Sequence, residues 1–212
     1  MTSRVLLATN NAKKLAELRR IVAEQGLGVE IVGLADVDSY PEPAETEWTF
    51  EGNALIKARA GVEHSGLVTL ADDSGLCVDA LNQMPGVRSS RWAGPDHDDQ
   101  ANLELVLRQI DDVDDPLRGA RFVAAVALVT PDGRESTTRG EMGGQLARVP
   151  RGANGFGYDP IFVADDQLLE PGTEPLTTAQ MTAEQKDAIS HRGRALRAMV
   201  PQLLEVLGLE AS

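Results

Sequence analysis

Two adjacent carboxylates, Asp72 and Asp73, are the residues of this sequence best suited to chemistry. The mostly apolar residues 67–71 precede them and Ser74 follows. Carboxylates at the end of a strand can hold Mg²⁺, which prefers oxygen ligands. Neighbouring side chains of an extended chain face opposite ways, so one aspartate should face a ligand and the other support it. Glu45, in an acidic loop upstream, could join Asp73 on the metal, or it could simply be solvated.

A polar turn near the N-terminus has the features of a phosphate site. It follows an apolar strand at 5–8, precedes a predicted helix, and reads Thr9-Asn10-Asn11-Ala12-Lys13-Lys14. The free N–H groups and the dipole of a helix start favour an anion. The glycines and the Lys-Ser/Thr ending of a Walker A loop are missing. The alternative is an asparagine N-cap followed by solvated lysines.

A glycine-rich segment with two aromatic rings indicates a site for a flat ligand. It includes the run Phe156-Gly157-Tyr158-Asp159, although aromatic residues make up only 4% of the chain. Glycines permit close approach of the backbone and positive φ. The rings could stack on a ligand while the carboxylate makes a polar contact. The alternative is a glycine-rich hairpin whose rings fill the core.

A cationic segment near the C-terminus, from Lys186 through Ser190-His191-Arg192, is a second possible anion site. Ser190 is expected to cap the last helix, and His191 and Arg192 can donate hydrogen bonds to carbonyl or phosphate oxygens. The alternative is a capped helix junction with solvated charges. The chain has four lysines against sixteen arginines. Lysine nevertheless remains at this segment and at the polar turn, where a compact ammonium suits a tight phosphate site.

The elements that must position these side chains alternate between strands and helices. Apolar runs predict strands at 5–8, 31–32, 67–71, 122–129 and 161–163, and a hairpin turn predicts a returning strand at 135–139. Helical spacing predicts helices at 15–25, 50–64 and 103–110, and the capping box at 182–185 predicts a short helix. A last helix, capped by Ser190, has its apolar stripe at 196–207. Pro201 inside the last helix predicts a kink or a break. The fold class is therefore α/β, with ligands expected at strand-to-helix turns.

The composition and the net charge argue against several classes of protein, among them nucleic-acid-polymer binders and membrane proteins. A chain of 212 residues with a net charge of −13 fits one domain, and the charge argues against an exposed groove for polymeric nucleic acid. The only cysteine is Cys77, so neither an intrachain disulfide nor a thiolate zinc site is expected. No apolar run approaches the roughly 20 residues that span a bilayer, and no signal peptide is expected. We therefore expect a cytoplasmic protein without a membrane partner.

Taken together, the motifs resemble the inosine triphosphate pyrophosphatase-like family, the (d)ITP/XTP pyrophosphatases that remove deaminated purine nucleotides. The motifs follow the family order over nearly the whole chain. They are Thr9 to Lys14, Glu45-Thr46, Thr49-Phe50, Asn53-Ala54, Lys57-Ala58-Arg59, Ala71 to Leu76, Pro85-Gly86-Val87, Ser90-Arg91, Gly155 to Pro160, and Ser190 to Gly193. The resemblance implies one pyrophosphatase domain over 1–212, with an elongated two-lobed α/β fold, a central mixed sheet flanked by helices, and a cleft between the lobes.

The resemblance also implies a reaction and a set of roles. A purine nucleoside triphosphate such as ITP, dITP or XTP would be split by a homodimer into monophosphate and pyrophosphate with Mg²⁺. Asp73 would be the general base and, with Glu45, a metal ligand. The substrate-binding residues would be Thr9, Asn10, Asn11, Ala12, Lys13, Lys14, Ser74, Phe156, Gly157, Tyr158, Asp159, Lys186, His191 and Arg192. Within this set Phe156 to Asp159 would frame the base, while His191 and Arg192 would read it.

Two alternatives remain open at this point. One is a related house-cleaning pyrophosphatase for other modified bases, and the other is a nucleotide sensor without catalysis. The sequence also departs from the family where Asn10 replaces a frequent glycine, although asparagine tolerates left-handed geometry.

Overall fold

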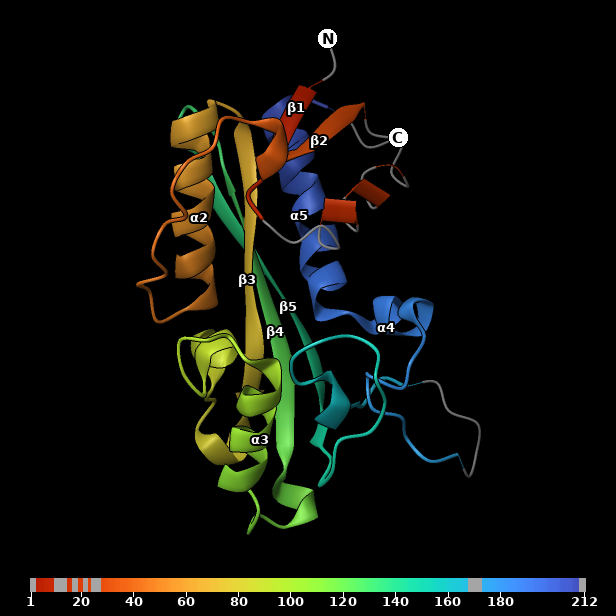
Figure 1. Ribbon diagram of the computed structural model, residues 1–212. Coiled ribbons are helices and arrows are strands. Elements are labelled where there is room, and N and C mark those ends of the chain that lie inside the picture. The colour runs from red at the N-terminus through yellow and green to blue at the C-terminus, as the bar shows by residue number, and fades with distance from the viewer. Residues whose placement is uncertain are drawn as a thin grey trace. The chain divides into compact units, whose positions relative to one another are not determined.

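A mixed six-stranded sheet, flanked by helices, forms the frame of the part of the chain that the computed structural model describes (Figure 1). That part comprises residues 3–9, 15–16, 19–20, 23, 28–167 and 173–209. The strand order is β2-β1-β3-β4-β5-β6. Strand β1 is parallel to both β2 and β3, whereas β5 and β6 are antiparallel. The predicted α/β class with a mixed central sheet is confirmed.

The strands are β1 (Ser3–Leu7), β2 (Val29–Gly33), β3 (Val68–Val78), β4 (Gly119–Val129), β5 (Glu135–Leu146) and β6 (Phe162–Ala164). The α-helices are α2 (Phe50–Ser65), α3 (Asp99–Gln109), α4 (Ala183–Ile189) and α5 (His191–Leu207). Short 3₁₀ helices are η1 (Leu34–Asp36), η2 (Asp79–Leu81), η3 (Gly86–Arg91), η4 (Asp115–Leu117) and η5 (Asp159–Ile161). The described residues at 15–16, 19–20 and 23 are also helical, as the sequence predicts.

The chain divides into two compact units. Unit 1 takes the described residues of Met1–Asp73, Ala124–Gly140 and Arg192–Ser212, and unit 2 takes Ser74–Val123 and those of Glu141–His191. Each unit has its own apolar core.

In unit 1 the alternation of β3 sends successive side chains to opposite faces of the sheet. Leu70 packs with the α5 side chains in one core cluster, whereas Ala71 packs with Ala54 and Ala58 of α2 in another. Helices α2 and α5 therefore cover opposite faces, and Figure 1 shows them on either side of β3. This alternation decides where Asp72 and Asp73, the next residues of β3, must point.

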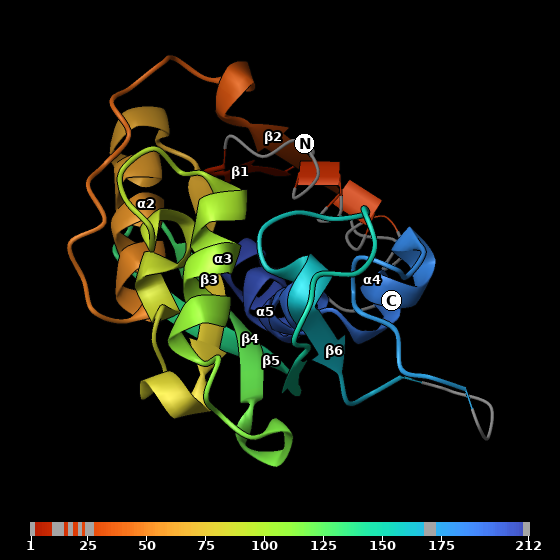
Figure 2. The ribbon, with the colours of Figure 1, turned by 60° about the horizontal axis from the view of Figure 1, so that its bottom comes forward.

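In unit 2 the second half of β3 packs with α3 and with β6 (Figure 2). Gly75 permits a close approach of η3, because a Cβ at this position would meet the Gly86 carbonyl and the Ser89 side chain. The Ser89 hydroxyl accepts a hydrogen bond from the Leu76 N–H (2.8 Å) and donates one to the Gly86 carbonyl (2.6 Å). The glycine after the paired aspartates thus has a packing role.

The end of one strand was predicted wrongly, and a break expected in one helix does not occur. Strand β3 does not end before Asp72 but continues to Val78, because the two carboxylates find cationic partners on both faces of the sheet. Helix α5 runs through Pro201 without a break, and Pro201 itself is exposed. A kink at Pro201, the other predicted outcome, stays a prediction. Within the residues that the structure describes, no helix is both long and apolar enough to cross a membrane.

Candidate active site

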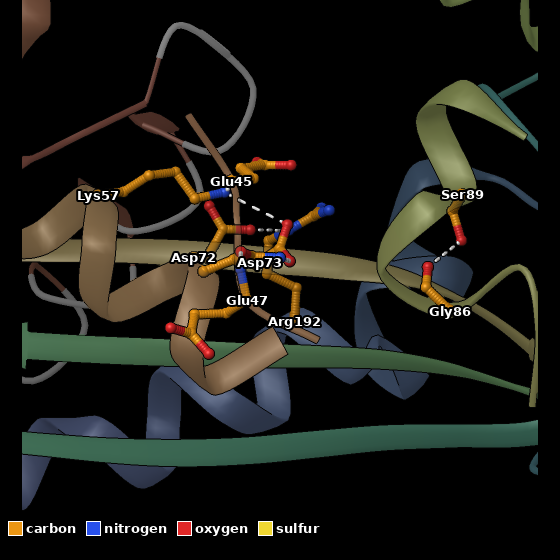
Figure 3. A network of polar contacts seen from close by, with 9 residues as sticks. Glu45, Glu47, Lys57, Asp72, Asp73, Gly86, Ser89 and Arg192 are labelled. Carbon is orange, nitrogen blue, oxygen red and sulfur yellow. Dashed lines mark hydrogen bonds and ion pairs between the residues drawn. The ribbon is translucent and has the colours of Figure 1, made fainter. Parts of the chain in front are cut away.

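Asp73 is the centre of a polar cluster inside unit 1 (Figure 3). Its Oδ1 accepts from the Lys57 ammonium (3.3 Å), and its Oδ2 accepts from the Asn53 amide (3.2 Å). The same ammonium donates to Glu45 Oε1 (2.9 Å). Asn53 and Lys57 are four residues apart on α2, so both lie on the helix face that meets β3. Loop, helix and strand therefore each supply part of one cluster.

Burial and neighbouring charges shift the pKa values of Asp73 and Lys57. Burial raises the pKa of Asp73 above its usual range; Lys57 opposes this shift and the Glu45 carboxylate adds to it. Burial alone would lower the pKa of Lys57, but the carboxylates, led by Asp73 and then Glu45, raise it overall. The result is a carboxylate of increased basicity beside an ammonium that stays protonated.

Asp72 points to the other face of the sheet. Its Oδ2 lies 3.5 Å from Nε of Arg192, in the first turn of α5, and both side chains are largely buried. The prediction that the two aspartates face opposite ways is confirmed. Asp72 orients an arginine, whereas Asp73 meets the lysine of the opposite helix.

The predicted phosphate turn is described only in part. Thr9 follows β1 and is half-buried, and its N–H donates to the Leu7 carbonyl (2.9 Å). The other members of the turn lie outside the described residues: Asn10, Asn11, Ala12, Lys13 and Lys14. Their role as a phosphate grip stays a prediction.

A second polar cluster, inside unit 2, is organised by the buried carboxylate of Asp159. Its Oδ2 accepts from the Phe156 N–H (2.9 Å) and from the Lys186 ammonium (2.5 Å), and its Oδ1 accepts from the Thr178 hydroxyl (2.7 Å). Gly155 has φ +79°, and a Cβ there would meet the Asp159 carboxylate. The segment's glycine and aspartate therefore shape one turn together.

The two aromatic residues of this segment have different surroundings. Tyr158 is buried, and its hydroxyl donates to the Ser89 carbonyl (2.8 Å). Phe156 is 51% exposed, with the Lys186 ammonium 5.4 Å from its ring centroid. The core-filling interpretation therefore holds for Tyr158. Stacking of the exposed Phe156 ring on a flat ligand stays a prediction.

The remaining predicted residues have surroundings of their own. His191 is buried and stacks on Phe122, with ring centroids 5.1 Å apart and an interplanar angle of 12°. Ser190 separates α4 from α5, and its backbone angles (φ −57°, ψ 126°) are not helical. Ser74 is half-buried in β3. Gly157 is half-buried and donates its N–H to the Asp99 carboxylate (2.9 Å).

Comparisons with known proteins identify the family of this chain. The sequence model of the Ham1 family matches residues 5–202. The chain belongs to the Ham1 family. It is 57% identical to the dITP/XTP pyrophosphatase of Corynebacterium efficiens over 97% of this chain and 99% of the relative.

Solved structures of this family have the same fold. A nucleoside-triphosphatase, dITP/XTP pyrophosphatase from Mycobacterium abscessus is 55% identical, with a TM-score of 0.77 over 93% of this chain and 99% of that one. A HAM1 protein from Coxiella burnetii is 38% identical, with a TM-score of 0.85 over 96% and 99%. The family resemblance inferred from the motifs is confirmed.

Two residues of the polar cluster around Asp73 had no predicted role. Asn53 and Lys57 were only parts of a motif, and the Asp72–Arg192 ion pair was not foreseen. The available signal was the spacing of four residues within a predicted helix, which places an amide and a rare lysine on one face. Nothing in the sequence alone indicated that this face would meet β3 at Asp73.

Proposed function

We propose that this Ham1-family chain hydrolyses deaminated purine nucleoside triphosphates, namely ITP, dITP and XTP, to the monophosphate and pyrophosphate. The observation that carries the proposal is the cluster of the buried Asp73 with the half-buried Lys57 and Glu45, in a chain related over nearly its full length to dITP/XTP pyrophosphatases. Hydrolysis of a phosphoanhydride needs charge neutralisation and positioning more than covalent catalysis. This cluster supplies charged groups of both signs.

Asp73 is the general base in this proposal. It would take a proton from the water whose oxygen attacks the α-phosphorus, while the bond to the β-phosphate oxygen breaks and pyrophosphate leaves. Burial raises the pKa of this carboxyl above its ordinary value, which makes the carboxylate a stronger proton acceptor. The protonated Lys57 keeps the carboxylate oriented and balances its charge.

The donor set fits Mg²⁺. Among the described residues, no group of three or more His, Cys, Asp or Glu side chains forms a metal centre. Glu45 and Asp73 nevertheless direct oxygens at one cationic group, the Lys57 ammonium, and carboxylate oxygens are what Mg²⁺ prefers. We propose that these two carboxylates hold Mg²⁺, which when bound would neutralise charge on the phosphate oxygens.

Recognition of the base is assigned to Phe156, Lys186 and the pair His191 and Arg192. The exposed Phe156 ring would stack on the purine, and Asp159 would hold Lys186 beside it. Arg192 can donate a hydrogen bond to the 6-oxygen of hypoxanthine or xanthine, but it cannot accept one from the 6-amino group of adenine. Such a mismatch is costly because it leaves buried polar groups unpaired.

A substrate panel with pyrophosphate detection tests the function. ITP, dITP and XTP should release pyrophosphate in the presence of Mg²⁺, and ATP and GTP far less. A well-folded protein that releases none from any of the three would overturn the proposal. High activity on other modified bases, with ITP a poor substrate, would instead indicate a different house-cleaning role. A homodimer is also proposed, and sedimentation equilibrium would test it.

A further inference from the structure

Asn53 connects the acidic loop to Asp73 through its two amide ends. It is the fourth residue of α2 and is fully buried. Its Nδ2 donates to Asp73 Oδ2 (3.2 Å), and its Oδ1 accepts from the backbone N–H of Glu47 (3.0 Å). One side chain therefore touches both the strand and the loop that carry the two proposed metal-binding carboxylates.

The two contacts determine the orientation of the amide. The Glu47 N–H can only donate, so it requires the carbonyl oxygen of Asn53. An ionised carboxylate can only accept, so Asp73 requires the amide nitrogen. No apolar or purely anionic side chain of the same shape satisfies both partners, and a buried unpaired group is costly.

The loop runs antiparallel along α2. Going forward along the loop, Tyr40 stacks on His64 with ring centroids 4.5 Å apart, Glu45 then pairs with Lys57, and Glu47 finally meets Asn53. The partners on α2 thus come progressively closer to its N-terminus. Figure 1 shows the loop beside α2 along the length of the helix. The contact between Glu47 and Asn53 is the last of these attachments, and Glu47 lies two residues after Glu45. Of the three partners on α2, Asn53 is the one that reaches Asp73 through a neutral group.

We propose that Asn53 is a positioning residue that fixes Glu45 relative to Asp73 and so sets the affinity for a divalent cation. The inference rests on the proposed function, because it takes these carboxylates as the metal ligands. Partners behind metal ligands commonly change metal affinity or activity by about 10–100-fold when they are removed. Asn53 acts on both ligands, on Asp73 directly and on Glu45 through the loop backbone.

The chain contains a matched control in Asn102. It is also buried and is the fourth residue of its helix, α3. Its Oδ1 accepts from the Ala93 N–H (2.6 Å) and its Nδ2 donates to the Ser90 carbonyl (3.1 Å). Both partners are backbone groups. Asn102→Ala therefore removes two comparable hydrogen bonds without touching a carboxylate.

The experiment measures Mn²⁺ affinity by electron paramagnetic resonance and loop mobility by fluorescence anisotropy, both without nucleotide. Trp48 follows Glu47 directly and is 79% exposed, so it reports on the loop once Trp92→Phe removes the second tryptophan. Asn53→Ala should raise the Kd for Mn²⁺ by roughly tenfold and lower the anisotropy of Trp48. Asn102→Ala should change neither, although both variants lower Tm.

A second pair of variants covers the case in which Asn53→Ala does not fold. Glu47 is exposed. Glu47→Pro removes the Glu47 side chain and also the backbone N–H that donates to Asn53. Glu47→Ala removes the side chain and keeps that N–H. The proline variant should reproduce the weaker Mn²⁺ binding and the mobile Trp48, and the alanine variant should not.

The results that overturn the proposal are specific. If Asn53→Ala loses stability but keeps its Mn²⁺ affinity or its Trp48 anisotropy, Asn53 is a core residue without the coupling role. If Glu47→Pro and Glu47→Ala change the Mn²⁺ affinity and the Trp48 anisotropy equally, the proposed coupling role of Asn53 is also wrong. Neither measurement uses a substrate, so a negative substrate panel and a negative result here are separate outcomes.

Discussion

Asp72 and Asp73 are neighbours in β3, yet their surroundings give them different chemistry. Asp72 is paired with the guanidinium of Arg192, which is always charged. Asp73 lies between an ammonium and a neutral amide, with a second carboxylate on the same lysine. Burial raises the pKa of Asp73. Of the two, Asp73 is therefore the better candidate for accepting a proton.

Asp73→Asn should separate catalysis from nucleotide binding. The amide keeps the shape of the side chain but cannot take a proton, so turnover should fall by roughly 10²–10⁴-fold, the usual contribution of a general base. Calorimetric binding of an ITP analogue should largely survive. Asp111→Asn, at an exposed aspartate of another pair, is the control and should keep full activity. Undiminished turnover of Asp73→Asn would show that the base is elsewhere.

Phe156→Ala should weaken nucleotide binding more than it weakens the fold. The ring is 51% exposed, so its removal should change stability little, as for most surface substitutions. Loss of stacking on the base should raise the Kd for the nucleotide by roughly tenfold. Leu117→Ala removes another exposed apolar side chain, 65% exposed, and should leave that Kd unchanged. A Tm loss without a Kd change would make Phe156 a structural residue.

At the scale of elements, helix α2 carries Asn53 and Lys57, two side chains of the polar cluster in unit 1. An N-cap residue fixes the start of this helix. Thr49 is the N-cap, and its hydroxyl accepts from the Gly52 N–H (3.1 Å). The next turn carries Asn53, and the turn after it carries Lys57. The position of both polar groups therefore depends on the first turn of this helix.

Thr49→Ala should destabilise this start by about 1 kcal/mol, the typical value of an N-cap. Thr49→Ser keeps an oxygen acceptor and should stay near the wild-type stability. Urea denaturation measures the first effect, and hydrogen exchange of the first α2 turn localises it. If both variants unfold at the same urea concentration as the wild type, the cap contributes nothing.

The bounds of a helix could be predicted where they depend only on nearby residues, such as caps and helical spacing. Helix α2 was expected at 50–64 and spans Phe50–Ser65, and the capping box of Thr182 and Gln185 does begin α4. Strand β3 was misjudged because Asp-Asp-Ser-Gly is typical of a loop. The strand continues through these residues since side chains remote in sequence, Lys57 and Arg192, neutralise the two carboxylates. Local sequence patterns do not contain that information.

The site residues were predictable as types but not as contacts. Motif order singled out Asp73, Glu45 and Phe156 together with their expected chemistry. The attachment of Glu45 to Lys57 depends on a loop lying along α2. The division of roles between Phe156 and Tyr158 depends on which ring the turn at Asp159 buries. Both outcomes are set by tertiary packing.

At the scale of the whole molecule, the charge of −13 opposes the approach of a highly anionic nucleotide. Binding must therefore rely on local cations, and a divalent metal lowers the charge that has to be accommodated. A ligand that binds only the folded state stabilises it by about 2.7 kcal/mol at a concentration of 100 times its Kd.

An ITP analogue with a methylene bridge between the α and β phosphorus atoms should therefore raise Tm in the presence of Mg²⁺. For a chain of this size the stabilisation corresponds to a shift of roughly 5–10 °C. Chelation by EDTA should remove most of that shift, because the proposed ligands Glu45 and Asp73 would then repel the phosphates. The matching ATP analogue should give a much smaller shift at the same concentration. Differential scanning fluorimetry decides both points: a shift that survives EDTA would contradict the metal requirement, and equal shifts for both analogues would contradict selection of the 6-oxopurine.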